Sequence, residues 1–231
     1  MRSAFPALIV ALHALSLFEV SEAQAQVIPS AYTYVEERQE AGLFAGFRNA
    51  ARGRFGYGPP GGQLLGARYG IELAGPLSLE GIVGTMHGMR DIINPGRPEG
   101  DRVIGEGDVL LTTIDARLKL TATGNRSWHG LSPFMVFGGG IAFDLAGASA
   151  AEELLEPEDV FEFGKSFFGT LGLGTRWFVT DRVALRTDGV FSLWQLDTPP
   201  GFGGTLYGFE DVAENEWVRA LSLTATLMFR W

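Results

Sequence analysis

The chain has 231 residues, enough for one sizeable domain, with a net charge of −9, 32 glycines and no cysteine. The negative charge argues against the basic face that phosphate binding needs, so we expect no nucleic-acid partner. The lack of cysteine excludes disulfides, thiolate metal sites and a lipoprotein anchor.

The first 25 residues are organised like a secretory signal peptide. Arg2 supplies positive charge, an apolar run extends from Ala4 to about Val20, and Ala23-Gln24-Ala25 has the small-x-small form of a signal-peptidase site. An uncleaved membrane anchor is the alternative, but the cleavage motif favours removal. Downstream, no stretch reaches the roughly 18 uninterrupted apolar residues of a membrane-spanning helix.

The rest of the chain shows runs of about ten residues that alternate in polarity, the period of β-strands. In the last run Leu221, Leu223 and Leu227 share one face, while Ser222 and Thr224 lie on the other. Strands of this length can cross a membrane at a tilt. The eight predicted strands are 41–50, 65–73, 77–90, 110–120, 135–143, 167–179, 183–195 and 217–231.

The connections between the strands alternate in length. Tight turns are expected at 74–77 and 180–182, an intermediate one at 124–131, and long loops at 51–63, 91–106, 146–163 and 196–216. This asymmetry is typical of outer-membrane barrels, whose long loops lie outside the cell. We predict an all-β, eight-stranded antiparallel up-and-down transmembrane β-barrel in the outer membrane. Residues 1–25 would be the signal peptide, 26–40 a periplasmic lead-in and 41–231 the barrel.

A soluble barrel also alternates in polarity, with its apolar face inside. Here the other face carries many glycines and full charges, and aromatic residues gather near the ends of the apolar face, as interfacial girdles do. This pattern favours lipid outside. The girdle aromatics are Tyr69, Phe143, Trp177, Trp217, Phe229 and Trp231.

Three stretches resemble the family of small outer-membrane β-barrels that includes the OmpA transmembrane domain and OmpX-like proteins. They are 133–140 (PFMVFGGG), 171–182 (LGLGTRWFVTDR) and 226–231 (TLMFRW). The resemblance implies the barrel fold and a final strand that the barrel-assembly machinery recognises by its terminal aromatic residue. Phe229 and Trp231 would form this signal, although Phe is commoner than Trp at the last position. Members of this family differ in function.

An eight-stranded barrel encloses a lumen that side chains just fill, so a large pore is not expected. Buried charges must be paired, and we predict that Glu80, Asp115 and Asp188 neutralise Arg68, Arg117 and Arg186, with Arg176 in the same network. A narrow solute channel is the alternative. The full inward set is Arg48, Arg68, Arg117, Lys119, Arg176, Arg186 and Arg230 against Glu72, Glu80, Asp115, Asp144 and Asp188.

Two of the long loops, 146–163 and 196–216, are strongly acidic. Calcium prefers such oxygen ligands, but no loop has EF-hand spacing, and a solvated surface explains the charges as well. The last loop also holds Phe202, Tyr207 and Phe209, which either form adhesive contacts or fold over the barrel mouth. On the apolar face, His87 and Arg219 lie near the loops. They would contact lipopolysaccharide phosphates or snorkel at the interface.

The sequence contains no recognisable catalytic motif. His87, with Asp91 nearby, is the one candidate for the lipid A chemistry that some small barrels perform, but no serine is evidently placed beside it. We therefore expect a monomeric, non-enzymatic protein without cofactor or bound metal. Its role would be structural or a surface interaction, adhesion-like in character, through long acidic extracellular loops, with the interior plugged by charged side chains. Its partners would be outer-membrane lipid and lipopolysaccharide, and the barrel-assembly machinery during biogenesis. A lipid A-modifying enzyme or a narrow channel is the alternative.

Overall fold

The computed structural model describes residues 30–36, 38–203 and 207–231. The chain divides into two units, Met1–Ser30 and Ala31–Trp231, and the description that follows concerns the second. The predicted signal peptide, 1–25, lies outside the described residues. Among those residues, no helix is long and apolar enough to cross a membrane.

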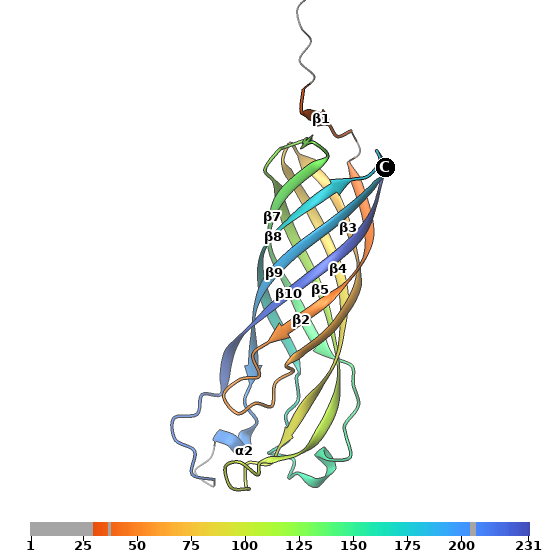
Figure 1. Cartoon of the computed structure of the whole chain (residues 1–231). Coiled ribbons are helices and arrows are strands. Elements are labelled where there is room, and N and C mark those ends of the chain that lie inside the picture. Colours follow the sequence, from red (N-terminus) through yellow and green to blue (C-terminus); the bar gives the residue numbers. More distant parts are fainter. Residues whose placement is uncertain (1–29, 37, 204–206) are drawn as a thin grey trace, which may run out of the picture. The chain divides into compact units, whose positions relative to one another are not determined.

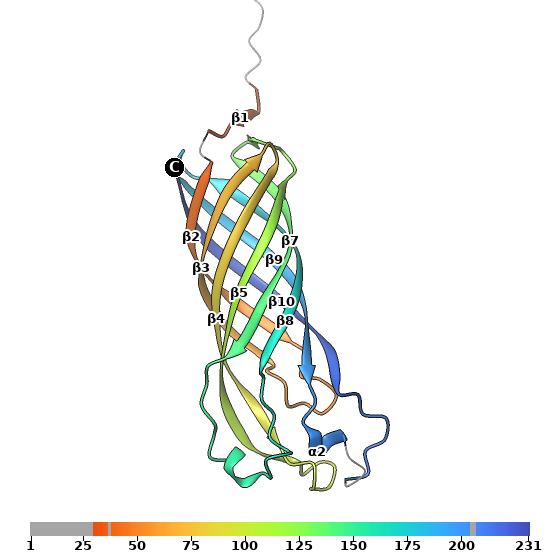
Figure 2. The ribbon, with the colours of Figure 1, turned by 180° about the vertical axis from the view of Figure 1, so that it is seen from behind.

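Eight long strands form a closed antiparallel barrel, which confirms the predicted fold (Figures 1 and 2). Each strand pairs with the next along the chain, and β10 pairs with β2 to close the sheet. The strands are β2 (Gln39–Ala50), β3 (Gly61–Ala74), β4 (Leu77–Ile93), β5 (Val103–Thr121), β7 (Leu131–Asp144), β8 (Lys165–Phe178), β9 (Val183–Asp197) and β10 (Asn215–Arg230).

Two short strands extend the wall at the end of the barrel that bears the C-terminus, here called the turn end. β1 (Tyr32–Tyr34), within the predicted lead-in, pairs with β6 (Arg126–Trp128), within the predicted middle turn. His129 and Gly130 then make a two-residue turn into β7, with φ of 49° and 77°, the left-handed values that such hairpin turns require. The lead-in therefore contains a strand, and β2 begins at Gln39 rather than at residue 41.

The β4–β5 hairpin projects beyond the other strands at the opposite end, here called the loop end (Figure 2). Both ends of the predicted loop 91–106 are paired backbone, with Asp91 opposite Glu106 and Ile92 opposite Gly105, so the loop itself is only 94–102. Ile92 and Ile93 are buried, which explains why the hairpin continues past the membrane-spanning part. The other loops are 51–60, 145–164 with η1 (Glu152–Leu154), and 198–214 with α2 (Pro200–Gly203).

The two faces of the barrel are the reverse of those in a soluble protein. Large apolar side chains point outward, for example Leu43 at 73% exposure and Leu173 at 67%, while full charges such as Glu80 and Arg186 are 1% exposed in the lumen. A soluble barrel with the apolar face inside is therefore excluded. An apolar exterior around a polar interior is the arrangement of a transmembrane β-barrel.

Candidate functional site: a closed lumen and a folded loop head

Glu80 lies at the centre of the charged network in the lumen. Its carboxylate accepts hydrogen bonds from Arg186, with Nη1–Oε1 and Nη2–Oε2 distances of 2.5 and 3.1 Å, and its Oε1 lies 2.9 Å from Lys119 Nζ. These residues come from β4, β9 and β5, so the contact spans the lumen. Burial without partners would be prohibitive for each charge, and the pairing is what permits it.

Asp188 extends the network along β9. Its Oδ1 lies 3.2 Å from both Arg68 Nη1 and Arg186 Nε, and it accepts a hydrogen bond of 3.1 Å from the Thr224 hydroxyl. Arg68 also places its guanidinium 4.9 Å from the centre of the Phe44 ring, a cation–π contact. The structure thus brings together Arg68, Arg186 and Asp188, three of the predicted network residues.

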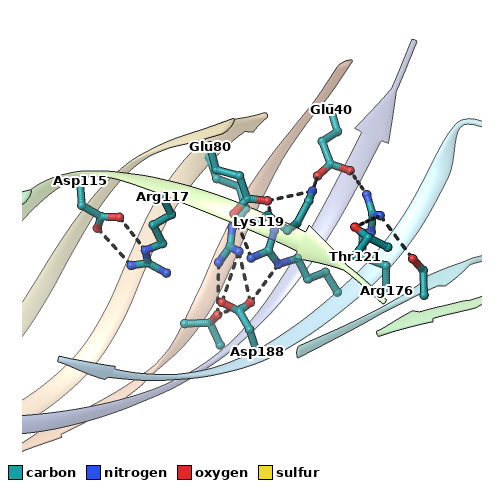
Figure 3. Close-up of polar contacts among 12 residues, drawn as sticks. Glu40, Glu80, Asp115, Arg117, Lys119, Thr121, Arg176 and Asp188 are labelled. Carbon is teal, nitrogen blue, oxygen red and sulfur yellow. Dashed lines mark hydrogen bonds and ion pairs between the residues drawn. The ribbon is translucent and has the colours of Figure 1, made fainter. Parts of the chain in front are cut away.

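Glu40 carries the network to the turn end, and the sequence analysis did not include it. Its carboxylate pairs with Lys119 and, at 2.8 Å, with Arg176 Nη1 (Figure 3). Arg176 also donates hydrogen bonds to the Thr121 and Ser132 hydroxyls. The sequence places Glu40 in the predicted lead-in, because residues 36–40 are all polar and show no alternation. The signal that could have identified it is its inward parity with Gly42 and Phe44.

Asp115 and Arg117 form a separate pair on β5. Arg117 Nε lies 2.7 Å from Asp115 Oδ1, and no contact drawn in Figure 3 joins this pair to the chain that runs from Asp188 to Arg176. All seven predicted network residues therefore face the lumen, but in two groups. Of the other predicted inward acids, Glu72 accepts from the Asn125 side chain and Asp144 accepts from backbone N–H groups.

The lumen leaves little free space. Between the charged side chains of the lumen, the cavities beside Glu40 and beside Arg48 have volumes of about 30 and 20 Å³, the size of one or two water molecules. Toward the loop end the interior is filled by buried apolar side chains: Leu64, Met86, Leu111, Phe168 and Trp194. In this conformation, the geometry gives no support to a solute channel.

The loops at the loop end fold into one unit, here called the head: residues 51–60, 90–106, 145–164, 198–203 and 207–216. At its centre lies an aromatic cluster contributed by three different loops. Ring centroids are 4.9 Å apart for Phe55 and Phe202, and 4.5 Å apart for Tyr57 and Phe161. Phe202 is buried, so the last loop is folded over the barrel mouth and does not expose this ring.

Charged side chains link the loops of the head to β4 and to one another. Arg90 on β4 pairs with the buried Glu152 and donates a hydrogen bond of 3.1 Å to the carbonyl of Phe161. Arg54 donates to the carbonyls of Glu210 and Asp211, which joins the first and last loops. Such contacts restrain loops that would otherwise be independent of one another.

The hydroxyls of Tyr57 and Tyr207 in the head also form hydrogen bonds. Burial raises the pKa of Tyr57, whose Oη lies 3.3 Å from Thr198 Oγ1. Tyr207 donates a hydrogen bond of 3.0 Å to the buried Asp159, and this bond raises the pKa of Tyr207. Two acids of the predicted acidic loop, Glu152 and Asp159, are therefore buried and stabilise the head through these contacts.

The remaining acids make the outside of the head negative. Most of them are exposed, and among the described residues no group of three or more histidine or acidic side chains is arranged to hold a metal ion. The exposed acids of the head are Glu99, Asp101, Glu106, Glu153, Glu156, Glu158, Glu162, Glu210, Asp211 and Glu214.

His87 and Arg219 are both exposed on the outer face near the loop end, but the structure does not bring them together. His87 on β4 stands between Gln63 and Leu110, and Arg219 lies on β10, with β3 and β2 between their strands. Asp91 is engaged elsewhere, because its Oδ2 lies 2.5 Å from Arg52 Nη1. Within the described part of the chain, the His87 side chain makes no hydrogen bond.

The two residues predicted as the assembly signal lie at the turn end. The rings of Phe229 and Trp231 stack with centroids 5.9 Å apart, and Tyr69 lies 6.3 Å from Trp231. Together they form an exposed aromatic group at the rim of the apolar exterior. This is where an aromatic girdle meets the membrane interface.

Comparison with known proteins supports the fold. Neisserial surface protein A, NspA, has a crystal structure that matches with a TM-score of 0.50 and 14% identity, over 87% of this chain and 98% of that one. The N-terminal barrel domain of Pseudomonas aeruginosa OprF (TM-score 0.40, 15% identity, 83% and 99% coverage) and Yersinia pestis Ail with a heparin analogue (0.39, 10%, 83% and 99%) are more distant. No protein-family model and no curated protein sequence matches the chain.

The predicted resemblance to small outer-membrane barrels is thereby confirmed at the level of the fold. The apolar exterior, the charged lumen and the short turns opposite long loops together make the chain an outer-membrane β-barrel protein.

Proposed function

We propose that this outer-membrane barrel acts as a surface-interaction protein, adhesion-like in character, whose folded acidic head binds partners with a positively charged surface. The observation that carries the proposal is the head itself. Its aromatic side chains pack internally, around Phe202 and Phe161, while the exposed charged side chains among its described residues are mostly acidic. A rigid charged surface gives a partner a defined pattern to match and speeds encounter by electrostatic attraction.

The closed lumen supports the same reading. Among the described residues, the cavities between the charged side chains of the lumen are water-sized and an apolar layer lies at the loop end, which favours the long loops as the part of the molecule that binds a partner. Loops carried on a rigid scaffold are where binding residues concentrate in proteins. We further propose that the barrel is monomeric, and that His87 and Arg219 contact lipopolysaccharide at the outer rim.

Attachment to charged beads tests the role of the head. Cells that display the chain should bind polylysine-coated beads better than cells that lack it, and a variant carrying Glu153→Gln, Glu156→Gln and Glu158→Gln should lose most of this gain. Added salt should weaken the attachment, because exposed charges are screened within about 8 Å at physiological ionic strength. The measurement is the number of beads per cell by flow cytometry.

The matched control is Asp181→Asn, which neutralises an exposed acid at the turn end and should leave attachment unchanged. Polyglutamate beads should not bind. Equal attachment by cells with and without the chain would count against a charge-guided surface role.

We also propose that the chain is not a lipid-modifying enzyme. His87 faces outward with Gln63 and Leu110 as cross-strand neighbours, and Asp91 is paired with Arg52, so no base–orienter pair is assembled around it. Lipid A from cells expressing the chain or its His87→Ala variant should give the same mass spectrum as lipid A from cells without it. A new acylation or deacylation product that disappears in the variant would overturn this.

A further inference from the structure

Arg48 is a buried cation that pairs with no acidic side chain in the part of the chain that the structure describes. It points into the lumen from β2 at 6% exposure, donates a hydrogen bond of 2.9 Å from Nε to Ser222 Oγ, and lies 5.3 Å from the centre of the Trp194 ring. Among the described residues, no carboxylate approaches its nitrogens within 4.0 Å, and its Nη1 has no hydrogen-bond partner.

The carboxylates nearest in the lumen are already engaged. Asp115 is held by Arg117, and Asp188 is shared between Arg68 and Arg186. Arg48, Arg68 and Arg117 line the same cavity of about 20 Å³ as Asp115 and Asp188. Among the residues that line this cavity, three guanidinium groups thus face two carboxylates, so the lining carries one positive charge in excess.

Bulk water has little access to compensate for that charge. The loop-end side of the lumen is filled by apolar side chains, including Leu64, Phe168 and Trp194, none more than 5% exposed. An uncompensated ion in such surroundings costs several kcal/mol, and arginine does not relieve the cost by losing its proton. A neutral water molecule would satisfy an N–H group but would not balance the charge.

From this cluster we infer that the cavity binds one small monovalent inorganic anion, such as chloride, against Arg48. A single anion would cancel the excess charge and accept the unused Nη1 donor. The cavity volume admits one atom-sized occupant, since one water needs about 10–15 Å³ on the same measure, and so excludes sulfate or phosphate. The Ser222 hydroxyl, which accepts from Arg48, also lines the cavity and can donate its own proton to the ion. This site is independent of the proposed role of the head.

Refolding in different salts tests the inference, because the anion can then enter before the barrel closes. The chain without its predicted signal peptide, residues 26–231, is refolded into detergent in sodium chloride, sodium bromide or sodium gluconate at equal ionic strength. The midpoint of thermal unfolding is then read from heat-modifiable migration. We expect the midpoint to be about 3 °C higher in either halide than in gluconate, which is too large for the cavity. Arg48→Met should abolish the difference between the salts, and Arg219→Met, an exposed control, should retain it.

Crystals of the unaltered chain grown in bromide provide a measurement that does not depend on a variant folding. An anomalous bromine peak within hydrogen-bond distance of the Arg48 guanidinium, with the halide-dependent shift, would establish the site. Equal unfolding midpoints in the three salts, or bromide-grown crystals with no peak at Arg48, would overturn it.

Discussion

Replacing Glu80 by Gln is expected to lower the free energy of unfolding by about 3–5 kcal/mol, the usual cost of removing one partner from a buried ion pair. Glutamine has nearly the same volume, so the cause is electrostatic. Lys119 and Arg186 would each lose one of their two carboxylate partners in a lumen where each is at most 1% exposed, and only Glu40 and Asp188 would then remain to neutralise them. Urea unfolding of the barrel in lipid vesicles, followed by tryptophan fluorescence, measures the change.

Glu99→Gln is the matched control, since it removes the same charge at an exposed position in the head. A second variant, Glu80→Gln with Lys119→Met, removes one cation as well and should recover part of the loss, because the excess of positive charge falls. If Glu80→Gln and the unaltered chain were equally stable, the negative charge of Glu80 would not be needed to neutralise the buried cations of the lumen.

Replacing Phe202 by Ala should open the head while leaving the barrel intact. The ring is 1% exposed and packs against Phe55, Tyr57 and Phe209. Its loss leaves a cavity in a small cluster with few other apolar contacts, and this should destabilise the folded head by about 3–5 kcal/mol. Local opening would then become frequent, and a protease specific for Glu should cut the acidic loops faster by roughly two orders of magnitude. Mass spectrometry of fragments released over time gives the rate.

Leu154→Ala controls for this, because Leu154 belongs to the same head but is 76% exposed. Heat-modifiable migration should be unchanged in both variants, which separates the head from the barrel. Cleavage of the Phe202→Ala variant at the unaltered rate would mean that the aromatic cluster does not hold the loops.

The barrel was predictable because each strand must present one face to lipid and one to the lumen. Apolar residues therefore alternate with small or polar residues along each strand, with a period of two. In β10, Leu221, Leu223 and Leu227 alternate with small or polar residues over the whole crossing. Beyond the membrane the rule no longer applies. The outer parts of β4 and β5 therefore looked like a loop, although Asp91 and Glu106 are paired there.

The candidate site was predictable in kind but not in detail. Inward parity identified Glu80, Asp115 and Asp188 as lumen acids, but parity says nothing about which strands face one another across the barrel. The contact between Glu40 and Arg176 joins residues 136 positions apart. The head was still harder to predict, because its cluster depends on how Tyr57, Phe161 and Phe202, which come from three irregular loops, pack against one another.

The register of β8 and β9 sets Arg176 directly opposite Arg186, with both side chains inside the barrel. Like charges facing one another across a strand pair oppose its formation. Within this hairpin Asp188 pairs with Arg186, and the other carboxylates that pair with the two arginines, Glu40 and Glu80, come from β2 and β4 at the start of the sheet. The hairpin near the end of the chain is therefore poorly stable alone. It gains its full stability when the first strands arrive, which couples charge neutralisation to closure and disfavours a half-closed sheet.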